Sequence, residues 1–151
     1  MSIDRDDWGQ RIKAVERQYK TARLALERLR TQSLVDASIS LQFPDANNVK
    51  ETLAGLELTY VIRIFAVFEN GLRSYWQKVK PGKKPDMKPL IDAIGSKRKV
   101  SYNVLKEAHE VREYRNQIVH QKKPNEAAIS IAMDEVRKRL SMYFDRLPFQ
   151  W

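Results

Sequence analysis

Three side chains near the end of one predicted helix have the chemistry to bind a phosphate group and to move a proton. Arg115 and Asn116 are adjacent, and His120 lies one helical turn after Asn116. A guanidinium keeps its charge at neutral pH and can donate to two phosphate oxygens at once. An imidazole, with an ordinary pKa of about 6.5, exchanges a proton near neutral pH. These residues form the candidate site, with Arg115 for charge stabilisation and His120 for proton transfer.

An acidic and a basic residue interrupt the apolar faces of two predicted helices. On a helical wheel at about 100° per residue, Glu69 falls between Phe65 and Trp76. Arg115 falls at the centre of the apolar face of the later helix. An unpaired charge in a core is costly, so we expect Glu69 and Arg115 to meet or to face one polar cleft. In the simplest alternative, the pair only sets the register of two helices.

A metal site is not expected from this sequence. His109 and Glu113 are one turn apart, but His120 lies about 10.5 Å beyond Glu113 along the helix, too far for metal–ligand bonds of about 2 Å. The chain has two histidines and no cysteine. We therefore predict no metal, no other cofactor and no disulfide. His109 is predicted to lie on a solvated flank of its helix.

Positive charge is concentrated in the segment 78–99, which contains eight Lys or Arg residues and two Asp residues. The difference, +6, is most of the net charge of +9. Such a block attracts polyanions, and the attraction falls with salt; the alternative is a solvated loop with no partner. The candidate RNA-binding residues are Lys83, Lys84, Lys97, Arg98 and Lys99.

Apolar periodicity predicts helices along most of the 151 residues. The expected long helices cover about 8–29, 50–79 and 101–121, with a short helix around 88–94 and a final helix that ends before Pro148. Asp6 or Asp7 is expected to cap the first helix, Ser101 the third long one, and either Asn125 or Ser130 the last. Residues 31–52 are predicted to form a looser connection marked by turn residues.

These elements predict an all-α fold, a four- to five-helix up-and-down bundle. The length suits one domain over 1–151. The longest apolar stretch, 58–68, contains Arg63 and is too short to span a bilayer. No signal-peptide pattern is present, so the expected location is the cytoplasm, without a membrane partner.

The segment from Tyr114 to His120 resembles the signature of the HEPN superfamily. That signature is an Arg followed four to six residues later by His, often with a polar residue after the Arg. The stretch 61–73 is also similar to the long earlier helix of prokaryotic HEPN proteins. The resemblance covers about residues 6–148.

HEPN proteins are four- to five-helix bundles, and many are metal-independent ribonucleases that act as dimers. The resemblance implies that Arg115 and His120 are catalytic and that Asn116 is the accompanying polar residue. Glu69, assigned from the wheel, is expected to hold Arg115 in place. The implied reaction is cleavage of RNA by attack of its own 2′-OH on the adjacent phosphate.

One copy of the motif supplies a single histidine, whereas this cleavage often uses separate acid and base groups. A two-fold axis beside the helix would bring two copies together, so we expect a homodimer with a composite cleft. The resemblance also implies a toxin or defence role, with an antitoxin or inhibitory protein as partner. HEPN toxins paired with a nucleotidyltransferase antitoxin commonly have a Tyr two residues after the His, where this chain has Lys122.

Two other functions fit the same residues. The first is a non-catalytic HEPN-like module that binds nucleic acid or a protein through its basic segment. The second is a structural helical subunit in which Glu69 and Arg115 form only a register pair.

Overall fold

Helices make up nearly all of the described part of the chain, residues 4–42, 46–120 and 130–151 of this computed structural model. The all-α prediction is confirmed, and no strand occurs in those ranges. The described ranges contain six helices, whereas four to five were predicted. They are α1 (Arg5–Val35), α2 (Ala37–Gln42), α3 (Ala46–Val79), α4 (Met87–Arg98), α5 (Tyr102–Val119) and α6 (Met133–Phe144).

The predicted loose connection over 31–52 is wrong for most of its length. The first helix continues to Val35, α2 follows, and α3 begins at Ala46; Pro44 and Asp45 lie outside the described residues. No Pro or Gly interrupts residues 31–42, so the helical conformation can persist there. The chain turns only at Asp36, which is extended and accepts hydrogen bonds from Ser38.

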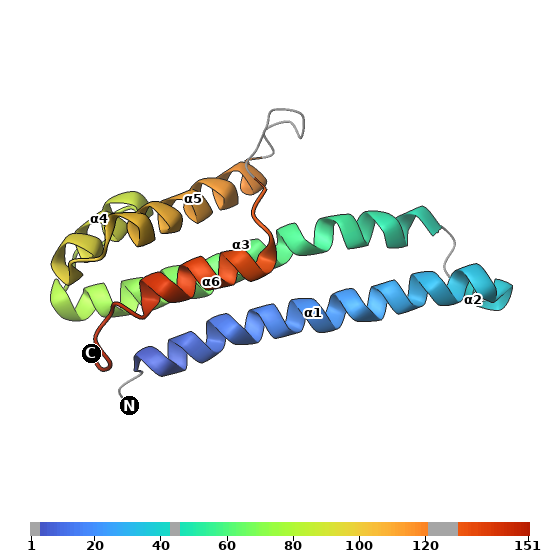
Figure 1. Cartoon of the computed structure of the whole chain (residues 1–151), viewed down its shortest axis with the longest axis horizontal. Helices are drawn as coiled ribbons and strands as arrows, with labels where there is room; N and C mark the ends of the chain where they lie inside the picture. Colours follow the sequence, from blue (N-terminus) through green and yellow to red (C-terminus); the bar gives the residue numbers. More distant parts are fainter. Residues whose placement is uncertain (1–3, 43–45, 121–129) are drawn as a thin grey trace.

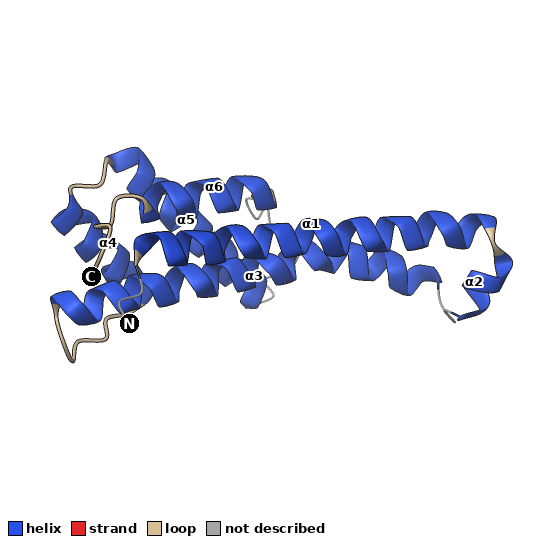
Figure 2. Cartoon of the chain, turned by 90° about the horizontal axis from the view of Figure 1, so that it is seen from below, coloured by secondary structure: helices blue, strands red, loops and turns tan. Residues whose placement is uncertain are grey.

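The two longest helices, α1 and α3, run antiparallel (Figure 1). The N-terminal half of α1 packs against α6, and the C-terminal half of α3 packs against α4, α5 and α6. The other halves of α1 and α3 project away together with α2 as an arm (Figure 2). Burial largely follows this division: the buried residues of α1 end at Tyr19, while Val49 is a buried residue of the arm half of α3. The up-and-down bundle is therefore confined to one end of the molecule.

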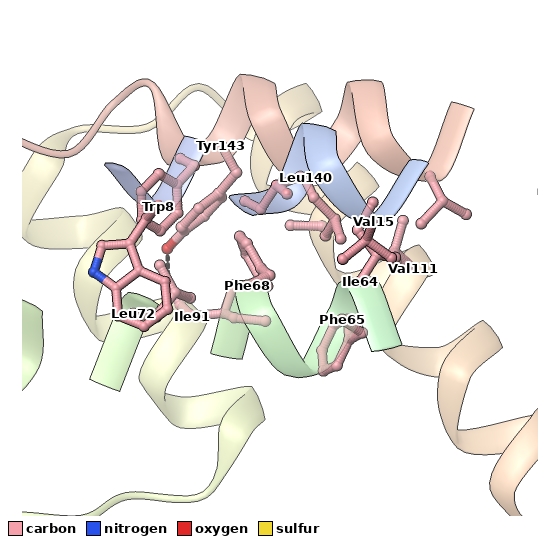
Figure 3. Close-up of a cluster of buried hydrophobic side chains, with 14 of the residues drawn as sticks. Trp8, Val15, Ile64, Phe65, Phe68, Leu72, Ile91, Val111, Leu140 and Tyr143 are labelled. Atoms are coloured by element: carbon pink, nitrogen blue, oxygen red, sulfur yellow. Dashed lines mark hydrogen bonds between the residues drawn. The ribbon is translucent and has the colours of Figure 1, made fainter. Parts of the chain in front are cut away.

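The core lies between α3 and α6, with α1, α4 and α5 around them (Figure 3). The Phe68 ring lies 5.7 Å from the rings of both Phe65 and Tyr143, measured between centroids. The Tyr143 hydroxyl donates to the Ile91 carbonyl at 2.7 Å and so links α6 to α4. Burial raises the pKa of the Tyr143 phenol far above its ordinary value, so this hydroxyl keeps its proton.

Two helices begin where acidic side chains satisfy their free N–H groups. The cap of α1 is Asp4, not Asp6 or Asp7; Asp4 accepts from the Asp7 N–H at 2.9 Å, and Asp7 accepts from the Asp4 N–H at 3.3 Å. This reciprocal pair is a capping box.

The start of α6 is capped from another helix. Ala132 precedes its first residue, and Glu57 of α3 accepts the Met133 N–H at 2.7 Å. A negatively charged carboxylate at the N-terminus of a helix also interacts favourably with the helix dipole. Of the two predicted caps, Ser130 lies before the helix and Asn125 lies outside the described residues. The third prediction, Ser101 before α5, is confirmed in position, although its side chain makes no capping hydrogen bond.

Candidate functional site

Arg115 lies on the face of α5 that packs against α3. Its guanidinium carbon is 5.8 Å from the centre of the Phe65 ring, and its Nη1 donates to Asn116 Oδ1 at 3.1 Å. Its Nε is inaccessible to solvent and has no hydrogen-bond partner in the described structure. The Arg115 guanidinium is thus half-buried, and it is held by the face of the Phe65 ring and by the side-chain amide of Asn116. Its charge is not neutralised by an acidic side chain in the described regions of the chain.

His120 lies at the end of α5 and is exposed. The helix ends at Val119, two residues before the predicted end, and His120 has φ −88° and ψ 6°. Its backbone N–H donates to the Asn116 carbonyl at 3.0 Å, so Asn116 supports Arg115 through its side chain and His120 through its main chain. The imidazole is open to solvent and is not sealed in the core.

Arg115 and His120 share one helix end but do not touch. Five residues correspond to a rise of about 7.5 Å along an α-helix. No hydrogen bond joins the two side chains in the part of the chain that the structure describes. For one chain to form the whole site, a bound substrate would have to contact Arg115 and His120 across that separation. Otherwise a second subunit would have to complete the site.

The predicted meeting of Glu69 and Arg115 is wrong. Glu69 Oε1 instead accepts from Arg73 on its own helix, at 2.9 Å from Nε and 2.8 Å from Nη2. Residues four apart lie side by side on a helix, so this partner was available at lower entropic cost than one on another helix. Glu69 is 26% exposed, at the edge of the apolar stripe rather than within it.

The basic segment forms two separate clusters. Lys83 and Lys84 lie exposed in the connection before α4, while Lys97, Arg98 and Lys99 lie exposed at its other end. The twelve residues of α4 separate the clusters by about 18 Å. Arg98 is tied down, because its Nε donates to the Arg146 carbonyl at 2.9 Å.

A cleft of about 510 Å³ lies between the last turns of α3 and the connection to α4. Lys83 and Lys84 line it together with two residues that the sequence analysis missed, Arg73 and Gln77. The signal for Arg73 was its four-residue spacing from Glu69. Arg73 was missed because a partner for Glu69 was expected on another helix and not on its own.

The prediction of a solvated flank is wrong for His109. Its Nε2 lies 2.6 Å from Asp92 Oδ1 of α4, the imidazole is 21% exposed, and Nδ1 is inaccessible without a partner among the described residues. This pair braces α4 against α5. On the same stripe, Arg112 pairs with Glu113.

No cluster of three His, Cys, Asp or Glu side chains suited to a metal ion occurs within residues 4–42, 46–120 and 130–151. In the same ranges, no helix has both the length and the apolar composition that crossing a bilayer requires. Comparison with protein-family models, with curated proteins and with solved structures found no match to this chain.

Proposed function

We propose that this protein is a metal-independent endoribonuclease that cleaves RNA through its own 2′-OH. The observation that carries the proposal is the arrangement at the end of α5. A half-buried Arg115, held by Phe65 and Asn116, lies about 7.5 Å along the helix from an exposed His120. The HEPN-like order of these residues supports the same reaction.

The reaction needs two proton transfers and one site of charge stabilisation. A base removes the 2′-OH proton, the 2′-oxygen bonds to phosphorus, and the bond to the 5′-oxygen breaks as an acid protonates it. His120 is accessible for one transfer. Arg115 would stabilise the negative charge that develops on the phosphate oxygens.

A second copy of the chain is the proposed source of the other proton-transfer group. With one motif histidine in each chain, a two-fold axis beside the end of α5 would supply His120 from both subunits. The exposure of His120 and of Val119, which is 43% exposed, leaves this helix end free to meet a partner.

A toxin or defence role in the cytoplasm, with an antitoxin or inhibitory protein as partner, remains part of the proposal by resemblance. Lys122, where related toxins often carry Tyr, lies outside the described residues.

Cleavage of a single-stranded RNA in the presence of a chelator tests the proposal. His120→Ala should lower the cleavage rate about a hundredfold or more, as expected for loss of a general acid or base, and should leave RNA binding intact. The matched control is His109→Gln, which removes the other histidine, and it should retain activity within a few-fold.

Two results would contradict the enzyme. One is a wild-type protein that binds RNA but never cleaves it, which would favour the non-catalytic binding module suggested by the basic clusters. The other is a His120→Ala variant as active as the wild type. The register pair assumed in the purely structural alternative does not form, because Glu69 pairs with Arg73 and not with Arg115.

A further inference from the structure

The cleft between α3 and the connection to α4 is lined by more basic than acidic side chains. Arg73, Lys83 and Lys84 line it, and Asp86 is the one acidic residue among its lining residues. The ammonium of Lys80 lies 5.6 Å from the centre of the Trp76 ring, which also lines the cleft. The surroundings are therefore positive and suited to an anion.

The connection that forms one wall is held in one conformation by α3. Gln77 Nε2 donates to the Lys83 carbonyl at 3.0 Å, and Gln77 Oε1 accepts from the Gly82 N–H at 3.3 Å. Gly82 has φ +79°, a left-handed conformation that glycine adopts without strain. Lys83 and Lys84 thus extend from a braced turn rather than a free loop.

Arg73 is the most restrained cation in the cleft. Its Nε donates to Glu69 Oε1 at 2.9 Å, its Nη2 lies 2.8 Å from the same oxygen, and its Nη1 donates to the Pro85 carbonyl at 2.9 Å. A guanidinium has five N–H donors, so two remain for a ligand after these three contacts. The side chain is 35% exposed, so part of it faces solvent.

We propose that this cleft is a phosphate-binding subsite for an RNA strand, with Arg73 as its anchor, Lys83 and Lys84 as its rim, and Glu69 as the residue that orients Arg73. The inference rests on the proposed function and assigns it a second contact with RNA. Arginine and lysine together suit a phosphate, which offers several acceptor oxygens to a fork and to point charges.

A strand, rather than a single small anion, is favoured by the distances to the other polar sites. The Lys97–Lys99 cluster lies about 18 Å away at the far end of α4. Arg115 lies over Phe65, eight residues before Arg73 on α3, or about 12 Å along that helix. That is the axial length of roughly three to four stacked nucleotides, at about 3.4 Å each. One strand could therefore reach the cleft and Arg115 at the same time.

Binding of a 2′-O-methyl RNA, which lacks the attacking hydroxyl, separates this inference from catalysis. Arg73→Gln should weaken binding about tenfold and lower the slope of log affinity against log salt by about one. Arg73→Lys, which keeps the charge but loses the fork, should fall in between. Lys83→Ala with Lys84→Ala should also weaken binding, and both side chains are exposed, so this variant does not endanger the fold.

The matched control is Arg30→Gln, which removes the same charge from an exposed position on the projecting arm and should change affinity less than about twofold. If Arg73→Gln weakens binding no more than this control, the inference is overturned. It is also overturned if polyglutamate competes as well as RNA, because the cleft would then suit acidic protein segments. If the wild type binds through Arg73 but does not cleave RNA, the subsite stands and the nuclease fails.

Discussion

Glu16 is the one polar or charged residue buried within the described ranges of the chain, at 7% exposure. Its carboxylate accepts from Lys20 at 2.9 Å and from Arg137 Nε at 2.7 Å, which joins α1 to α6. Burial acts to raise the pKa of Glu16, but the hydrogen bonds from Lys20 and Arg137 outweigh it and hold the pKa below its ordinary value. The group is therefore ionised in the folded protein well into the acid range.

A pKa lowered by folding makes the contribution of Glu16 depend on pH. The stabilisation is fully present above the unfolded pKa of about 4.3 and is lost as the pH falls through the lower folded value. We predict that Glu16→Gln lowers the free energy of unfolding by about 1–2 kcal/mol at neutral pH. Urea titrations at several pH values should show this difference shrinking toward zero in acid.

The control for that series is Glu51→Gln, an exposed glutamate on α3, which should alter stability little at any pH. A deficit of Glu16→Gln that stays constant down to the acid range would mean that packing, and not ionisation, is responsible.

For individual residues, the sequence predicts the environment of the candidate site only in part. The position of Arg115 on the apolar face of α5 and its partial burial follow from periodicity. Its true neighbours, Phe65 and Asn116, could not be derived, because a helical wheel shows which face a residue occupies but not which residue lies opposite. The same limit produced the wrong pairing of Glu69.

The close approach of α3 and α6 depends on Gly71. A Cβ added there would lie 2.6 Å from the Phe144 ring and 3.3 Å from Trp8. Both rings are buried, so neither can move aside cheaply. We predict that Gly71→Ala destabilises the protein by about 1–3 kcal/mol, as overpacked cores do, measured by chemical denaturation.

The comparison for Gly71 is Gly55→Ala, since Gly55 is also within α3 but nothing lies within 4 Å of its added Cβ. That change should stabilise the protein by about 0.5–1 kcal/mol, because alanine loses less entropy in a helix. Equal effects of the two substitutions would show that helix propensity alone decides, and that the contact with α6 does not.

Helix bodies were more predictable than helix ends. The apolar repeat in α3, α5 and α6 persists through their centres, and the structure has helices there. The starts of α1 and α6 were missed because their N–H groups are satisfied by Asp4, two or three residues before the expected cap, and by Glu57 of a distant segment. A cap supplied by tertiary contact leaves no local signal.

For the whole molecule, the proposed two-fold site makes activity depend on association. We predict that an inactive His120→Ala variant, mixed in excess with the wild type, lowers cleavage below that of the wild type alone, because a mixed dimer holds only one of the two imidazoles that the proposed site uses. The measurement is the initial rate against mixing ratio, with subunit mass followed by sedimentation.

Mixing the wild type with the same excess of Arg30→Gln, which changes an exposed position on the projecting arm, is the control, and it should not lower cleavage because every dimer keeps both imidazoles. An RNA-cleaving wild type that sediments as a monomer at nanomolar concentration would argue against a shared site.

The central position of α6 has a consequence for how the chain folds during synthesis. Leu140, Tyr143 and Phe144 are almost wholly buried against helices that precede α6 in the chain. Until α6 leaves the ribosome, the apolar faces of α1, α3 and α5 have no cover at the centre of the bundle. The nascent chain therefore exposes hydrophobic surface for most of the time that it is being translated, and chaperones bind chains in this state.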